Sequence, residues 1–119
     1  MADEDVTFTT AQLLTKIISI TPTANRTLTL PTAANAVTVI TGVKVGNSID
    51  FTIINESTPI NQASVIITVG TGGSFIGSDT VHPVQNLSET YFTSGSGTFR
   101  MRFTNITTSF EAYDVYRIS

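Results

Sequence analysis

Two stretches of the chain alternate between hydrophobic and polar residues at every second position. The hydrophobic members are Phe99, Met101 and Phe103 in residues 97–105, and Ile49, Phe51 and Ile53 in residues 46–55. Side chains in a β-strand point alternately to opposite faces, so each stretch predicts a strand with one buried face and one solvated face. We expect these two strands to be the main walls around a single core.

Shorter segments of the same kind predict further strands, at residues 6–9, 17–20, 26–30, 63–69, 74–77, 90–93 and 111–118. Two helical turns are expected between them, one over residues 11–15 with Thr10 as its cap and one over residues 32–39 with Thr32 as its cap. Several short strands joined by turns are typical of sandwiches and jelly rolls. The predicted fold class is all-β: a single antiparallel β-sandwich, jelly-roll-like, with about eight strands.

The last predicted strand carries large apolar side chains on both faces. Tyr113 and Val115 fall on one face, and Tyr116 and Ile118 fall on the other. A strand with two apolar faces is either central in its sheet or covered by another subunit.

Length and composition indicate one domain without disulfide bonds. The 119 residues contain no cysteine, which excludes disulfides and thiolate chemistry. Residues 1–5 are acidic and predict a flexible N-terminal arm, followed by a single β-sandwich domain over residues 6–119. No secretory signal pattern is present, and the longest apolar runs are far shorter than the about 20 residues that span a bilayer. We therefore expect a soluble protein that does not bind a membrane.

Charge is sparse and slightly negative. Nine acidic and six basic residues give a net charge of −3, which provides no positive field for a nucleic-acid backbone. Threonine is abundant, with 22 residues, and it suits the solvated side of a pleated sheet. A surface built from hydroxyl groups in place of charges favours a protein that is partly covered by neighbouring molecules.

Candidate catalytic and ligand-binding residues are few. The glycines of Gly70-Thr71-Gly72-Gly73 suggest a phosphate-binding loop, but no lysine follows, and a hairpin turn that needs positive φ explains them better. His82 is the only histidine and is read as a loop residue. We predict no catalytic residue, metal site, cofactor or small-molecule substrate, and no enzyme activity.

Arg100 and Arg102 form the densest positive spot of the chain, on the polar face of one wall strand. An arginine fork binds a carboxylate with defined geometry, so these two residues are candidates for contact with a partner protein. The alternative is an ordinary solvated strand face.

Five segments, taken together and in this order, resemble a small β-sandwich module of virion proteins. Such modules occur in tailed bacteriophages, cyanophages among them, and in some large DNA viruses. The segments span most of the chain: Thr9-Thr10-Ala11-Gln12-Leu13-Leu14-Thr15, Arg26-Thr27-Leu28-Thr29-Leu30-Pro31-Thr32-Ala33, residues 45–55, residues 97–105, and Val115-Tyr116-Arg117-Ile118.

The resemblance implies a capsid decoration (cement) protein, made in the host cytoplasm and located on the outer capsid surface of the virion. Such a protein would act as a homotrimer that stabilises contacts between subunits of the major capsid protein. The alternative is a trimeric tail-fibre or head-fibre knob, or a receptor- or sugar-binding module. Under the first reading the N-terminal residues would bind the capsid or an adjacent copy, with Asp3, Glu4, Asp5, Val6 and Phe8 as contacts beside the two arginines. The oligomer contact would come from Tyr113, Val115, Tyr116 and Ile118.

Overall fold

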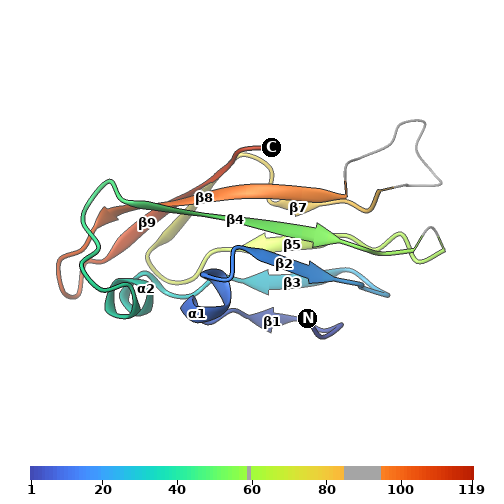
Figure 1. Ribbon diagram of the computed structural model, residues 1–119, viewed down its shortest axis with the longest axis horizontal. Helices are drawn as coiled ribbons and strands as arrows, with labels where there is room; N and C mark the ends of the chain where they lie inside the picture. Colours follow the sequence, from blue (N-terminus) through green and yellow to red (C-terminus); the bar gives the residue numbers. More distant parts are fainter. Residues whose placement is uncertain (59, 85–94) are drawn as a thin grey trace.

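The computed structural model describes residues 1–58, 60–84 and 95–119. In these ranges the chain forms nine strands and two short helices, arranged as an elongated two-sheet sandwich 47 Å long (Figure 1). The predominance of β-structure expected from the alternating pattern is confirmed. The strand predicted at residues 90–93 lies outside the described residues.

The two sheets contain four and five strands. Sheet A has the order β1-β3-β5-β7, with β1 at Val6–Thr7, β3 at Arg26–Thr29, β5 at Val65–Thr68 and β7 at Thr80–Val81. Sheet B has the order β2-β4-β8-β9-β6, with β2 at Ile17–Ile20, β4 at Ser48–Asn55, β8 at Ser96–Asn105, β9 at Ala112–Arg117 and β6 at Gly73–Ile76. The two-residue strand β7 falls in a segment for which the sequence predicts no strand, because two residues are too few to show a period.

The expectation of an antiparallel jelly roll is wrong, because both sheets are mixed. The parallel pairs are β1 with β3, β2 with β4, β3 with β5 and β6 with β9. The antiparallel pairs are β4 with β8, β5 with β7 and β8 with β9.

The path of the chain explains the parallel pairs. The first eight strands alternate strictly between sheet A and sheet B. A strand of sheet A is followed by a strand of sheet B, so the chain can re-enter sheet A in its original direction. Parallel neighbours need a crossover connection, and here the opposite sheet and the short helices supply it. The N-terminal part of the protein is therefore a flattened coil with a core between its two layers.

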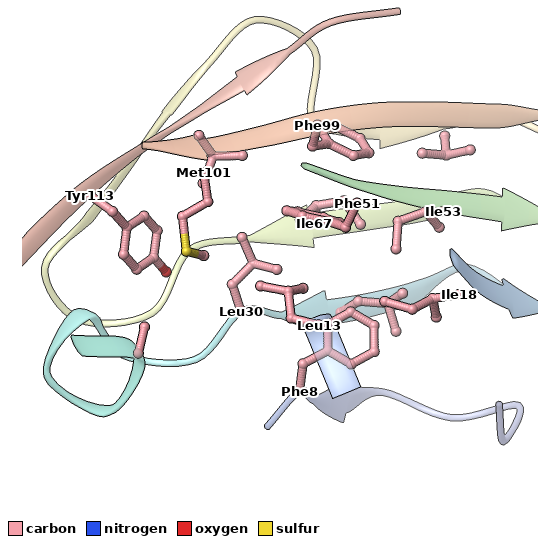
Figure 2. Close-up of a cluster of buried hydrophobic side chains, with 14 of the residues drawn as sticks. Phe8, Leu13, Ile18, Leu30, Phe51, Ile53, Ile67, Phe99, Met101 and Tyr113 are labelled. Carbon is pink, nitrogen blue, oxygen red and sulfur yellow. The ribbon is translucent and has the colours of Figure 1, made fainter. Parts of the chain in front are cut away.

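The two wall strands predicted from the sequence are neighbours in one sheet. In the register of β4 and β8, Phe51 lies opposite Phe99, and their rings stack with centroids 5.5 Å apart. Both rings are buried, as are Ile53, Met101 and Phe103, whereas Ile49 is half-buried. Figure 2 shows Phe51, Ile53, Phe99 and Met101 in one cluster with Ile67 of sheet A and Leu13 of the first helix.

Both short helices begin at a threonine cap. Helix α1 spans Thr10–Leu13 and is capped by Thr9, not by Thr10 as predicted, since the Thr9 hydroxyl accepts from the Gln12 amide and the Gln12 side chain accepts from the Thr9 amide. This is a capping box. Helix α2 spans Ala33–Val39, and its predicted cap Thr32 is confirmed.

Candidate functional site

The outer face of sheet B brings together residues that lie far apart in the sequence. Alternation along each strand places one set of side chains in the core and the other set outside. The outward set, named here the outer face of sheet B, consists of Ile17, Ser19, Ser48, Asp50, Thr52, Ile54, Ser74, Ile76, Ser96, Thr98, Arg100, Arg102, Asp114, Tyr116 and Ile118. Four of the residues predicted to contact partners are in this set: Arg100, Arg102, Tyr116 and Ile118.

Arg100 is engaged within its own chain. It lies opposite Asp50 in the register of β4 and β8, and its Nε and Nη2 atoms donate to the two Asp50 carboxylate oxygens at 2.8 and 3.0 Å. The hydrogen bond from Arg100 lowers the pKa of Asp50, and the bond to Asp50 raises the pKa of Arg100. The two-point geometry fixes the guanidinium plane, but both side chains are about half exposed, so solvent screens the pair.

Arg102 is the other arginine on this face. It is exposed, and it lies opposite Ser48 on β4 and opposite Asp114 on β9. Within the described part of the chain Arg102 makes no ion pair, while the Asp114 carboxylate accepts from the Tyr116 hydroxyl at 3.3 Å. The face thus carries two acidic and two basic side chains.

Three exposed isoleucines surround these charges. Ile17 is 66% exposed, Ile118 is 50% exposed and Ile76 is 46% exposed. Ile17 is on the edge strand β2 and Ile76 is on the opposite edge strand β6. Figure 1 shows α1 and α2 along the lower margin of the molecule, beyond the strands of sheet B.

Tyr113 and Val115, which the sequence analysis also assigned to the oligomer contact, lie elsewhere. They are 1% and 0% exposed, and Figure 2 shows Tyr113 inside the core. The predicted division of the last strand into two faces is therefore seen, but only the face of Tyr116 and Ile118 is at the surface. Strand β9 lies between β8 and β6, so its second apolar face is covered by the molecule's own core. A second copy cannot contact Tyr113 or Val115 unless the core opens.

The N-terminal residues lie against strand β3. Asp3 accepts hydrogen bonds from Arg26 Nε at 2.8 Å and from the Thr23 hydroxyl at 2.7 Å. Chiefly through the bond from Arg26, these contacts lower the pKa of Asp3 to about 2. Asp5 accepts from the Thr27 amide at 2.9 Å.

The other predicted N-terminal contacts differ in exposure. Glu4 is exposed, Val6 is half-buried and Phe8 is 2% exposed. Phe8 is therefore a core residue, shown beside Leu13 in Figure 2, and cannot serve as a surface contact.

Beside these residues the molecule has an open end. Strands β1 and β2 are edge strands of sheets A and B, so one side of each has no neighbouring strand among the described residues. Along this end lies a hollow of about 440 Å³, lined by Thr7, Phe8, Thr9, Thr10, Ala11, Pro31, Thr32, Asn35 and Val39. A second hollow of about 230 Å³ is lined by Met1, Gln12, Thr15, Ile17, Ile18 and Ser19. Unpaired edges next to hollows are suited to binding another chain.

The glycines of residues 70–73 allow this turn to pack closely against neighbouring backbone. A Cβ at Gly70 would lie 2.6 Å from the main-chain oxygen of Leu30, and Gly72 has a φ of +87°. The Gly70 amide donates to the Tyr113 hydroxyl and the Gly73 amide donates to the Gly70 oxygen. The predicted hairpin is wrong, since this turn connects β5 in sheet A to β6 in sheet B. Amides used within the fold do not form a phosphate cradle.

Sequence reasoning missed one polar pair, Ser64 and His82. The Ser64 hydroxyl lies 3.2 Å from His82 Nδ1, at an exposed position. The antiparallel pairing of Val65 with Val81 places them next to each other. A catalytic imidazole needs a third group that orients it, and no described carboxylate bonds to His82. The described residues contain no group of three or more potential metal ligands.

No protein-family model, curated protein or solved structure matches this chain. Within the described ranges, no helix has the length and apolar character needed to span a membrane. What the protein does must therefore be inferred from its own surfaces.

Proposed function

We propose that the protein is a structural protein of a virion: a capsid decoration (cement) protein that binds the outer capsid surface as a homotrimer. The supporting observation is that one small domain presents two surfaces of different character, each suited to contact with another protein. The outer face of sheet B carries both signs of charge, whereas the open end offers the unpaired edge of β1 and the larger, mostly apolar hollow. A cement protein needs two such surfaces, one for its own copies and one for the shell.

The composition of the chain also supports this proposal. Only 15 of the 119 residues are charged. Few charged side chains therefore have to lose their water when neighbouring molecules cover the surface. The segments that resemble virion proteins coincide with α1, β3, β4, β8 and the end of β9. They include both strands that carry the Asp50–Arg100 pair.

The mechanism is mechanical. Three copies in a closed ring sit where subunits of the major capsid protein meet, and each copy binds more than one subunit. Because the protein binds the assembled shell and not separated subunits, it stabilises the shell by mass action. When the free protein is at 100 times its dissociation constant, its binding stabilises the assembled shell by about 2.7 kcal/mol per site.

We assign the open end to the capsid contact. It carries the larger hollow, whose lining is mostly apolar, and Val39 in that lining is 45% exposed. Deleting residues 2–9 would not test this assignment, since it removes the core residue Phe8. A surface substitution is required.

The test uses capsids from the virus that encodes the protein, prepared without it. Wild-type protein is expected to co-sediment with the capsids at a fixed ratio and to raise the temperature at which they release DNA. Val39→Glu is expected to weaken binding. Val45→Glu is the matched control, because it changes another exposed valine, 59% exposed against 45% for Val39, in the loop before β4. Absence of co-sedimentation, or binding to host cells in its place, would overturn the proposal in favour of a fibre knob.

A further inference from the structure

We infer that the outer face of sheet B is the surface through which the copies of this protein associate with one another. The inference rests on the proposed function, because it identifies the contact that builds the trimer. The occupant of the face is a second copy of the same chain.

The face carries equal numbers of acidic and basic side chains. Asp50 and Asp114 balance Arg100 and Arg102, so the face has no net charge to repel an identical molecule. Asp50 and Arg100 are already paired within the chain, whereas Arg102 has no ion pair with another described residue. A neighbouring copy can present its Asp114 carboxylate to this arginine, and an arginine fork then fixes the register of the two faces.

The apolar side chains occupy both sides of the face. Ile17 lies on β2 at one edge, and Ile76 lies on β6 at the other, with Tyr116 beside it in the register of β6 and β9. In a threefold ring, one part of the surface meets a different part of the next copy. The edge with Ile17 of one copy can therefore pack against the edge with Ile76 and Ile118 of the next.

The same features disfavour other occupants. A surface with two acidic and two basic side chains does not attract a nucleic-acid backbone or an anionic membrane. Exposed isoleucines beside a tyrosine and an unpaired arginine are typical of protein contacts, where aromatic residues and arginine are enriched.

The test is the solution mass of the purified chain, measured by size exclusion with light scattering over a dilution series from about 100 μM to below about 1 μM, which gives the midpoint of association. Wild type is expected at three times 12.7 kDa. Ile118→Glu and Ile76→Glu are each expected to shift the association midpoint by about tenfold or more, with an unchanged circular dichroism spectrum. Arg102→Asp is expected to act in the same direction.

Val39→Glu and Val45→Glu are the matched controls, because each adds the same charge at an exposed apolar position outside this face. Both should keep the wild-type mass. A wild type that is monomeric at every concentration, or face variants with the wild-type association midpoint, would overturn the inference. Failure of the proposed function is a different result: wild type and controls form trimers, but none of them binds capsids.

Discussion

The Tyr113 hydroxyl donates a hydrogen bond to the main-chain oxygen of Pro31 at 2.8 Å. The same hydroxyl accepts from the Gly70 amide at 3.0 Å. Tyr113 belongs to sheet B, whereas Pro31 and Gly70 closely follow strands β3 and β5 of sheet A. One buried side chain thus connects the two layers at the end of the core near α2 (Figure 2), and burial raises the pKa of its phenol.

We expect Tyr113→Phe to lower the free energy of unfolding by about 1–3 kcal/mol, because it leaves the Pro31 oxygen and the Gly70 amide without partners while the ring stays in place. Urea unfolding measures this change. Tyr116→Phe is the matched control, since the Tyr116 hydroxyl makes a longer bond of 3.3 Å at a half-buried position. Equal effects of the two substitutions would contradict the assigned role of Tyr113.

Asn55 is a second buried polar group on which the fold depends. Its side-chain amide is 1% exposed and donates to the main-chain oxygens of Ala63 and Val81, while its oxygen accepts from the Ser57 amide. Asn55→Ala removes these three hydrogen bonds from the interior, so we expect a loss of about 2–4 kcal/mol in unfolding free energy. Urea unfolding measures this loss, and the dependence of the unfolding free energy on urea concentration should be unchanged.

Asn105→Ala is the control for this prediction. The side-chain oxygen of Asn105 also accepts a hydrogen bond from the amide two residues later, that of Thr107, but this bond is exposed to solvent. Its replacement should cost less than half of what Asn55→Ala costs. If the two substitutions cost the same, burial of Asn55 is not the source of its effect.

The contact of Asp3 with Arg26 should depend on pH. Asp3 has a folded-state pKa of about 2 against an ordinary value of 3.8. Its contribution to stability is therefore fully present above about pH 4 and is lost as the pH falls toward 2. Wild type and Asp3→Asn should differ in urea midpoint at about pH 6 and converge as the pH falls below about 2. A difference that persists unchanged at the lower pH would contradict the assigned ion pair.

Local pattern was sufficient to predict the principal strands and one of the two helix caps of this protein. The alternation of Phe99, Met101 and Phe103 with polar residues predicts β8, because successive side chains of a strand point to opposite faces whatever the neighbouring strand is. The cap at Thr32 is likewise a local signal. The cap at Thr9 could also have been found, since Gln12 stands three residues later, as a capping box requires.

The neighbours of each strand could not be predicted in the same way. A strand that pairs in parallel and one that pairs in antiparallel fashion have the same alternation, so the pattern of Ile17–Ile20 does not reveal its pairing with β4. The contact of Ser64 with His82 is hidden for the same reason, because it depends on the pairing of β5 with β7. The assignment of Arg100 to a partner failed to anticipate Asp50, which lies opposite only once β4 and β8 are in register.

The sequence by itself determined which side chains of each strand face inward, since a period of two is a local property of an extended chain. It thereby separated Tyr113 and Val115 from Tyr116 and Ile118. Only the tertiary structure decided which of these two sets reaches the surface and which residues join it there. That outcome depends on the order of strands in the sheets. Strand order is set by packing between segments far apart in the sequence, and the local pattern of one segment does not reveal which other segment it pairs with.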